Sequence, residues 1–197
     1  MATKKKTKEA KPVKVNLGGG QYKEEGWINL DIVDLPEVDV VHDLTKFPWP
    51  FEDNSVDEIK SSHLIEHIDG PTFLKFMDET YRILKPAEFD PNNPNIPTKG
   101  FQTHVAPYYN SIRCWQDPTH KQAISEAKFL YFNKEWREQN KLDHYPVTCD
   151  FDFYYQYNVD QGWSQRSQES LQFAMKHYTN VINDIIVTLV KRPKKKS

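Results

Sequence analysis

Three glycines stand together at residues 18–20, directly after a short apolar segment at residues 13–17. The whole chain has only 7 glycines, so their placement is informative. Glycine lets a backbone approach a ligand without an intervening Cβ, and ligands of parallel α/β sheets bind beyond the carboxyl ends of the strands. Asp31 lies near the end of a second apolar segment, residues 27–32, where a carboxylate can accept hydrogen bonds from ribose hydroxyls. The pattern indicates a nucleotide-type ligand.

The spacing narrows the type of nucleotide. The dinucleotide fingerprint G-x-G-x-x-G needs a third spaced glycine and an acidic residue about 20 positions further on. Asp31 follows Gly20 by only 11 residues, which disfavours NAD. No Gly-Lys-Ser/Thr follows the glycines, which disfavours a phosphate-binding P-loop. An adenosine ligand without a pyrophosphate remains.

His63, Glu66 and His67 form the sequence H-x-x-E-H. On a helix this spacing would place two imidazoles on one face as zinc ligands, with the glutamate as general base. A third carboxylate ligand on a second helix has no evident candidate, so a zinc hydrolase is a minor alternative and we expect no metal site. In the other interpretation, Glu66 and His67 satisfy the start of a helix and contact the substrate loop.

Asp117 and His120 lie three residues apart in an irregular segment. They could form a general base with an orienting carboxylate. The sequence Asp-Pro-Thr-His is equally typical of a turn, and both interpretations stay open. Tyr108, Tyr109 and Asn110 follow an expected strand and are predicted to line an acceptor pocket.

The elements that must position these residues fit one domain. The chain has 197 residues, of which 38% are hydrophobic and 13% aromatic, enough for a packed core. We expect strands at residues 13–17, 27–32, 38–41, 56–62 and 101–107, a helix at residues 72–84, a long loop at residues 87–100, a short helix at residues 125–131, and an antiparallel pair of strands at residues 151–159 and 181–190 around residues 161–180.

Composition excludes several classes. Two cysteines are too few for a disulfide scaffold and favour a cytoplasmic protein, which would be the host cytoplasm for a phage-encoded chain. No apolar run approaches the roughly 18 residues of a membrane span, so no membrane partner is expected. We predict flexible basic tails at residues 1–12 and 191–197 around a domain at residues 13–190. Residues 15–190 carry 15 basic and 27 acidic residues, which disfavours nucleic-acid binding by the body and leaves weak polyanion contact to the tails.

Several motifs together resemble the class I S-adenosylmethionine-dependent methyltransferases, especially small bacterial and phage-encoded members. The resemblance is close over residues 13–86 and weaker beyond them. It implies an α/β, Rossmann-like methyltransferase fold, with a mostly parallel sheet and an antiparallel C-terminal edge. The motifs are VNLGGG at residues 15–20, GWINLD at 26–31, VDVVHDL at 38–44, PWPFEDNSVDEI at 48–59, SSHLIEHI at 61–68, YRILKP at 81–86, VAPYYNS at 105–111 and DPTHK at 117–121.

The resemblance also implies roles for individual residues. Gly18, Gly19 and Gly20 would form the turn under the methionine and ribose parts of S-adenosylmethionine, and Asp31 would bind the ribose. The adenine would be flanked by Asp43 and Leu44, and the methionine moiety would be contacted by Ser61 and Ser62. His63 would lie at the mouth of the site, where His63 or His120 would serve as a base.

Three departures from the family pattern stand out. Asn16 occupies a position that is usually acidic, and Gly19 one that is usually Cys or another small residue. The segment between Gly20 and Trp27 is too short for the usual first helix. The connection between the second and third strands is shorter than the dozen residues that a parallel crossover needs.

The sequence thus predicts a methyltransferase with S-adenosylmethionine as cofactor and an unidentified acceptor. No Asn/Asp-Pro-Pro-Tyr/Phe motif follows the fourth strand, which disfavours amino-methylation of DNA bases. The main alternative is a degenerate methyltransferase fold that acts as a binding or structural module, for example in a viral assembly.

Overall fold

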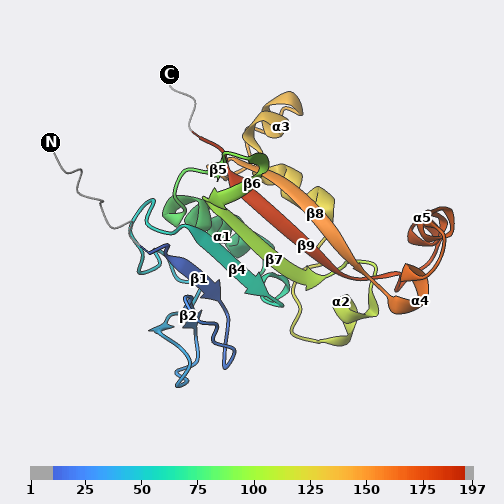
Figure 1. Cartoon of the computed structure of the whole chain (residues 1–197), viewed down its shortest axis with the longest axis horizontal. Helices are drawn as coiled ribbons and strands as arrows, with labels where there is room; N and C mark the ends of the chain where they lie inside the picture. The colour runs from blue at the N-terminus through green and yellow to red at the C-terminus, as the bar shows by residue number, and fades with distance from the viewer. Residues whose placement is uncertain (1–10, 194–197) are drawn as a thin grey trace, which may run out of the picture.

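The computed structural model describes residues 11–193, which form a seven-stranded sheet with the order β3-β2-β1-β4-β7-β9-β8. Neighbouring strands from β3 to β7 are parallel, and β9 runs antiparallel to both β7 and β8 (Figure 1). This confirms the predicted Rossmann-like sheet with an antiparallel C-terminal edge. The strands are β1 (Lys14–Leu17), β2 (Ile28–Asp31), β3 (Val40–Val41), β4 (Glu58–Ser62), β7 (Phe101–Pro107), β8 (Phe151–Val159) and β9 (Ile182–Lys191).

Helix α1 (Gly70–Ile83) covers the centre of one sheet face. Its start is fixed by Asp69, whose side chain accepts a hydrogen bond from the Thr72 amide at 3.1 Å, and by a proline in the first turn. Its apolar residues recur at spacings of three and four, so they share one face that packs on the sheet. Phe76 on that face lies 6.0 Å from the His104 ring of β7.

The other face of the central strands is more polar. In β4, Ile59 and Ser61 are buried under α1's side of the sheet, whereas Glu58 and Lys60 alternate with them and are only half-buried. Lys60 lies over the Trp27 ring at 4.1 Å. Parallel sheets usually bury both faces under helices. Here long side chains cover part of the second face instead.

The connections that flank β2 contain no helix. The segment after Gly20 is a series of turns, as the short spacing predicts. Residues 32–39 connect β2 to β3, which pair in parallel although the connection is short of a dozen residues. This connection succeeds because β3 has only two residues and therefore needs only a short return path.

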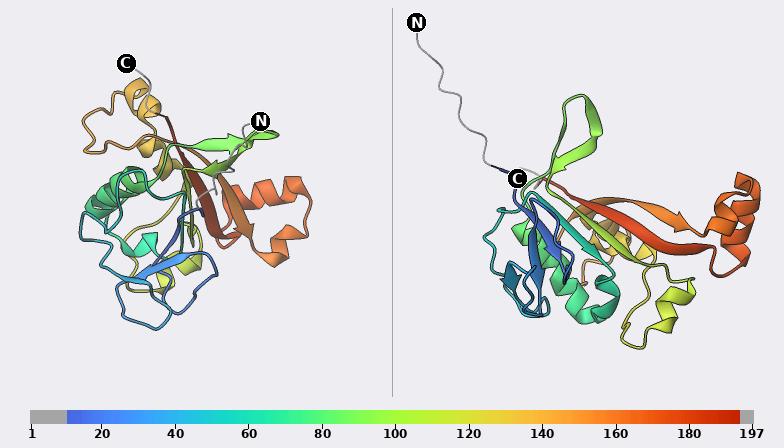
Figure 2. Two further views of the ribbon diagram at one scale, coloured as in Figure 1. Left: turned by 60° about the vertical axis from the view of Figure 1, so that its left-hand side comes forward. Right: turned by 60° about the horizontal axis from the view of Figure 1, so that its bottom comes forward.

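Two connections between strands of the main sheet contain regular structure. Residues 87–100 form the hairpin of β5 (Glu88–Asp90) and β6 (Asn93–Lys99), which projects from the sheet in Figure 2. Its prolines are tolerated because a two-stranded ribbon leaves backbone positions without a ladder partner. The residues between β8 and β9 form α4 (Gln161–Ser164) and α5 (Gln168–His177) at the far end of that strand pair (Figure 1).

The remaining helical segments follow β4 and β7. The expected short helix at residues 125–131 is a 3₁₀ helix, η2. These segments are η1 (Ile65–His67), α2 (Ile112–Gln116), η2 (Glu126–Phe132) and α3 (Lys134–Gln139).

The predicted tails fall mostly on residues 1–10 and 194–197, which lie outside the described residues. The C-terminal boundary differs from the expected one at residue 191. Lys191 is the last residue of β9 and is 5% exposed, with its ammonium donating to Asn54 Oδ1 and to the carbonyls of Tyr81 and Leu84. A buried ammonium with three acceptors belongs to the folded domain. Among the described helices, none has the length and apolar character needed to cross a bilayer.

Candidate functional site

The glycine turn lies at the carboxyl end of β1, beside the end of β2. Gly20 has a φ of +51°, a conformation that glycine adopts without strain, and its amide donates to Asp31 Oδ2 at 2.8 Å. Gly19 is required for a different reason. A Cβ there would lie 1.8 Å from Asn29 Oδ1 and 2.2 Å from Asn16 Nδ2.

A pair of amide side chains supports this turn from below. Asn16 Nδ2 donates to Asn29 Oδ1 at 3.0 Å, and Asn29 Nδ2 donates to the carbonyl of Gly20 at 2.9 Å. Both asparagines are buried. The unusual Asn16 is therefore part of the turn's scaffold. The role of Asn29 was missed because an Asn within a strand has no distinctive spacing.

Asp31 is positioned to bind a polar ligand at the end of β2. Its Oδ1 accepts a hydrogen bond from the Val33 amide at 3.0 Å, while Oδ2 accepts from Gly20. Each carboxylate oxygen has two acceptor positions, so both can accept a further hydrogen bond. The carboxylate is only partly buried. The turn and this carboxylate fit the ribose end of an adenosine-type cofactor.

Asp43 and Leu44 lie after β3, on the same edge of the sheet. Asp43 Oδ1 accepts from the amide and hydroxyl of Thr45, which lowers the pKa of Asp43. Leu44 is 8% exposed, and its carbonyl accepts from the Trp49 indole at 3.2 Å. The Leu44 side chain thus packs in the core, and the two hydrogen bonds from Thr45 to the Asp43 carboxylate both use Oδ1.

Ser61 and Ser62 at the end of β4 differ in direction. Ser62 is exposed, whereas the Ser61 hydroxyl donates to His104 Nδ1 at 2.7 Å inside the core. His104 in turn donates from Nε2 to Gln102 Oε1 at 3.0 Å, and burial lowers the pKa of His104 to about 3. The expected contact of the Ser61 side chain with a cofactor does not fit this orientation, because alternate residues of a strand face opposite sides.

His63 does not share a helix with His67. It has a φ of +52° and its amide donates to the Val105 carbonyl of β7, and the following helix η1 has only three residues. The minor alternative of a helical face with two zinc-binding imidazoles and a glutamate base is therefore wrong. His63 Nδ1 lies 3.4 Å from Glu66 Oε1, and this carboxylate raises the pKa of the half-exposed His63.

Glu66 is the centre of a cluster with His67 and His120. It is fully buried, and His120 Nε2 lies 3.9 Å from its Oε1. The rings of His67 and His120 are 4.7 Å apart. The pairing of Glu66 with His120 has no signal in the sequence, because the two residues are distant along the chain.

Asp117 and His120 are neighbours but not a hydrogen-bonded pair. Asp117 Oδ2 is 3.9 Å from His120 Nε2, while Asp117 Oδ1 accepts from the amide and hydroxyl of Thr119, which lowers the pKa of Asp117. The turn interpretation of this segment is confirmed. No hydrogen bond supports the other interpretation, in which Asp117 orients His120, and His120 Nδ1 donates instead to the Cys114 carbonyl at 2.9 Å.

The three predicted acceptor-pocket residues also separate. Tyr108 is 7% exposed, its hydroxyl donates to Glu126, and burial raises its pKa. Asn110 is tied to the loop before β9 through Tyr178 and Asn180. Tyr109 is 46% exposed, so it is the one of the three that is free to contact an acceptor. Ile112 and Trp115 on the adjacent α2 are also exposed.

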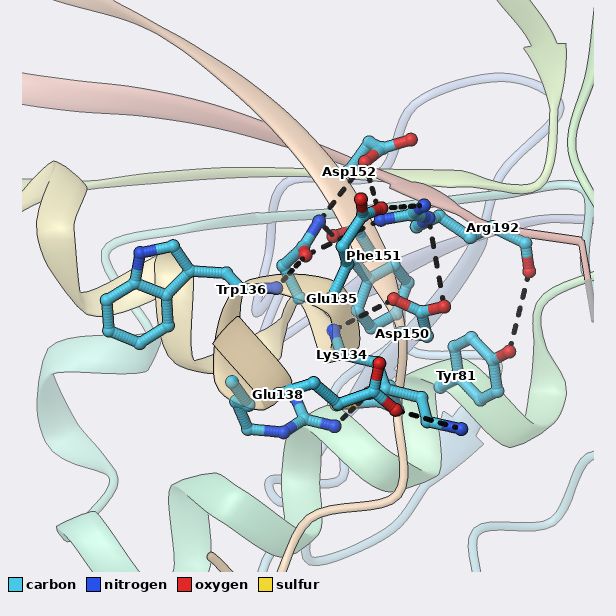
Figure 3. A network of polar contacts seen from close by, with 12 residues as sticks. Tyr81, Lys134, Glu135, Trp136, Glu138, Asp150, Phe151, Asp152 and Arg192 are labelled. Carbon is cyan, nitrogen blue, oxygen red and sulfur yellow. Dashed lines mark hydrogen bonds and ion pairs between the residues drawn. The ribbon is translucent and has the colours of Figure 1, made fainter. Parts of the chain in front are cut away.

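A hollow of about 1160 Å³ lies at the opposite end of the sheet, near the end of β9. Figure 3 shows Arg192 there beside Asp150, Asp152 and Glu135. The charges around Arg192 are paired with one another. This region therefore fits a structural ion-pair network, and the chemistry-bearing residues gather at the carboxyl end of the parallel strands.

Residues 21–88 match the family model described as "Methyltransferase domain". A search of curated protein sequences gave no match.

Solved structures share the fold. A SAM-dependent methyltransferase from Archaeoglobus fulgidus is similar with a TM-score of 0.61 and 17% identity, over 91% of this chain and 86% of that one. A complex of the Haloferax volcanii Trm112 methyltransferase activator with a methyltransferase gives 0.53 and 18%, over 94% and 84%. The Burkholderia thailandensis 1,6-didemethyltoxoflavin-N1-methyltransferase, solved with that compound and S-adenosylhomocysteine, gives 0.54 and 11%, over 93% and 72%.

Proposed function

We propose that this chain is a class I S-adenosylmethionine-dependent methyltransferase that binds S-adenosylmethionine and methylates an acceptor beside β4 and β7. Its Rossmann-like sheet and the match of residues 21–88 to the methyltransferase-domain model support the proposal. The observation that carries the proposal is the 2.8 Å hydrogen bond from the Gly20 amide to Asp31. It fixes against the glycine turn the carboxylate that would bind the ribose in this proposal. S-Adenosylmethionine bound there would supply an electrophilic methyl group on a sulfonium.

The chain's main contribution is orientation. Holding acceptor and methyl group in line can lower a barrier by roughly 7 to 11 kcal/mol, and displacement at the methyl carbon needs no covalent help. In this proposal, residues 18–20 and Asp31 hold the cofactor. Asp43, the backbone of Leu44 and the exposed Ser62 flank it. Tyr109 holds the acceptor from the side of β7.

His63 is the better candidate for a base where the acceptor arrives protonated. Its side chain is 47% exposed at the end of β4, and Leu64 beside it contacts the glycine turn closely enough that a Cβ on Gly18 would lie 2.8 Å from Leu64 Cδ1. His120 is 9% exposed, and its Nδ1 is committed to a backbone carbonyl. We therefore place His63 nearest the reacting atoms.

Calorimetric titration with S-adenosylmethionine and S-adenosylhomocysteine tests the proposal. Asp31→Ala should weaken binding about 10- to 100-fold, because charge-assisted hydrogen bonds contribute roughly 1.5 to 3 kcal/mol. The exposed Asp34→Ala, three residues further along, is the matched control and should bind like the wild type.

Two results would contradict the proposal. Unchanged affinity of Asp31→Ala would remove the ribose assignment. Absence of binding by the folded wild type would favour the degenerate module, whose basic tails would then be tested by deleting residues 1–12 and 193–197.

A further inference from the structure

The carboxylate of Glu66 lies in an unusual environment. The residue is fully buried, yet neither carboxylate oxygen has a hydrogen-bond donor among the described residues 11–193. The nearest basic nitrogens are His63 Nδ1 at 3.4 Å and His120 Nε2 at 3.9 Å. A buried carboxylate without donors is costly unless it is paired or coordinates a metal ion. A group that coordinates or neutralises the Glu66 carboxylate would complete this site.

The tautomer of the neutral His120 ring is fixed by its backbone partner. The carbonyl oxygen of Cys114 can only accept, so the proton of the neutral ring lies on Nδ1, which is 2.9 Å away. The other ring nitrogen, Nε2, therefore carries a free lone pair and faces Glu66. Histidine ligands of metals are typically oriented in this way, through a hydrogen bond from the nitrogen that does not bind the metal.

His67 is oriented by a chain of two hydrogen bonds. The Thr119 hydroxyl donates its one proton to Asp117 Oδ1 at 2.7 Å, since a carboxylate can only accept. Thr119 Oγ1 must then accept from His67 Nδ1 at 3.0 Å. The free lone pair of the neutral His67 ring is therefore also on Nε2. This Asp-Thr-His relay fixes the second ring as Cys114 fixes the first.

We propose that Glu66, His67 and His120 bind a divalent transition-metal ion. One donor atom from each residue lies within 4.8 Å of the other two. Bond lengths of about 2.1 Å around one ion place tetrahedral donors about 3.4 Å apart, so closure needs side-chain shifts of about 1 Å. Two imidazoles and one carboxylate suit zinc and its first-row neighbours better than magnesium or calcium.

The backbone holds the two halves of the site together. The amides of Lys121 and Gln122 both donate to the Glu66 carbonyl, at 2.8 and 3.2 Å, and the Gln122 side chain donates to the Ile65 carbonyl. The ligand from β7's side is thus fixed relative to those of η1. Preorganisation of this kind is what a metal site requires.

This site differs from a zinc-hydrolase H-x-x-E-H motif. Glu66 is a ligand here and not a base, and the second imidazole comes from His120 instead of His63. Three protein donors leave coordination positions for water or a substrate oxygen. The proposal does not depend on cofactor binding by the glycine turn, so the two can be tested separately.

The test is a titration of the metal-stripped, untagged protein with Zn²⁺ followed by calorimetry, and with Co²⁺ followed by visible absorption. The wild type should bind one ion, and Co²⁺ should give the intense spectrum of a four- or five-coordinate site. Glu66→Gln and His120→Ala should each weaken binding at least about 100-fold, and Thr119→Val, which breaks the relay to His67, about 10- to 100-fold. His144→Ala changes an exposed histidine elsewhere and should leave affinity unchanged. Cys114→Ser replaces a nearby thiol but keeps the backbone carbonyl that His120 contacts, so it should also leave affinity unchanged.

Circular dichroism checks that each variant is folded. If Glu66→Gln or His120→Ala does not fold, the wild type and Thr119→Val still test the proposal. Failure of the folded wild type to bind either ion would overturn the proposal. So would wild-type affinity in Glu66→Gln and His120→Ala, or loss of binding in Cys114→Ser alone. Titration of the same samples with S-adenosylhomocysteine distinguishes these outcomes from failure of the proposed function.

Discussion

Glu66 and Glu79 are both buried glutamates, but their surroundings are opposite. Glu79 on α1 accepts from the Trp49 amide at 2.6 Å and from Arg82 through both carboxylate oxygens, at 2.6 and 2.9 Å. Glu66 after β4 has no such donor among the described residues. The carboxylate of Glu79 is fully hydrogen-bonded within the fold, whereas that of Glu66 has two imidazoles at 3.4 and 3.9 Å and no hydrogen bond among the described residues.

The difference separates a structural charge from a functional one. A bidentate arginine pair with an additional backbone donor offsets the desolvation of Glu79 and joins α1 to the loop that holds Trp49. Glu66 has no hydrogen-bond donor among the described residues, and it faces the imidazoles of His63 and His120 at the end of the sheet where ligands of this fold class bind. Burial alone would not have distinguished the two residues. Their hydrogen-bond partners do.

The largest effect we expect is stabilisation by metal. Zinc at about one hundred times its Kd should stabilise the wild type by about 2.7 kcal/mol, which raises Tm by roughly 5 to 10 °C for a domain of this size. Glu66→Gln should lose this zinc-induced rise in Tm. Glu79→Gln should have a lower Tm without zinc and should still show the full rise when zinc is added. Differential scanning calorimetry with zinc and with a chelator measures the Tm of each variant. Equal zinc-induced shifts in the two variants would contradict the difference between Glu66 and Glu79.

Removing the charge of Glu79 should destabilise the protein. Glu79→Gln breaks the bidentate pairing with Arg82 and weakens the bond to Trp49, so we expect a loss of about 2 kcal/mol in the free energy of unfolding. Urea denaturation measures it. The exposed Glu25→Gln serves as control. A loss below about 0.5 kcal/mol would place Glu79 with ordinary surface charges.

His104 is a buried group whose protonation should make the free energy of unfolding depend on pH. Its pKa of about 3 in the folded state lies below the ordinary value of 6.5, so the unfolded chain binds a proton first as pH falls. Its contribution to stability is full above pH 6.5 and decreases from there toward pH 3, by about 1 kcal/mol between pH 6.5 and 5.5. Urea denaturation at both pH values should show this component in the wild type and not in His104→Gln. Equal pH dependence in the two proteins would contradict it.

The smallest effect should have the opposite sign to that at Glu79. In metal-free protein at about pH 8, Glu66→Gln removes a charge without a hydrogen-bond donor and should stabilise the fold by about 1 kcal/mol or less. Urea denaturation in the presence of a chelator is the measurement. A clear loss of stability would mean that His63 or His120 already compensates the carboxylate in the folded protein.

Much of the fold could be predicted from local sequence. Residues 13–17, 27–32 and 101–107 alternate or cluster apolar residues in ways that predict strands, and the α1 face follows a helical period. The resemblance to class I methyltransferases, based on motifs in residues 13–86, is confirmed at the level of fold. The β5–β6 hairpin was missed because its prolines and asparagines are typical of a loop, and only the pairing across residues 88–99 makes it a ribbon.

The candidate site was predictable only in part. The positions of Gly20 and Asp31 followed from strand ends, since the carboxyl ends of adjacent parallel strands meet at one edge. The direction of Ser61 did not, because its partner His104 lies 43 residues away on another strand. Side-chain direction depends on which face a neighbouring strand buries, and that is a property of the assembled sheet.

The sequence by itself determined the α/β class, the glycine turn and the acid that it faces, because these depend on backbone freedom and on the short-range order of strands. Only the tertiary structure decided that Glu66 and His67 meet His120, and that Thr119 fixes the tautomer of the neutral His67 ring across 52 residues. The physical reason is that a ligand set requires donor atoms within a few ångströms. Segments distant along the chain reach that separation only when the sheet and its connections are assembled.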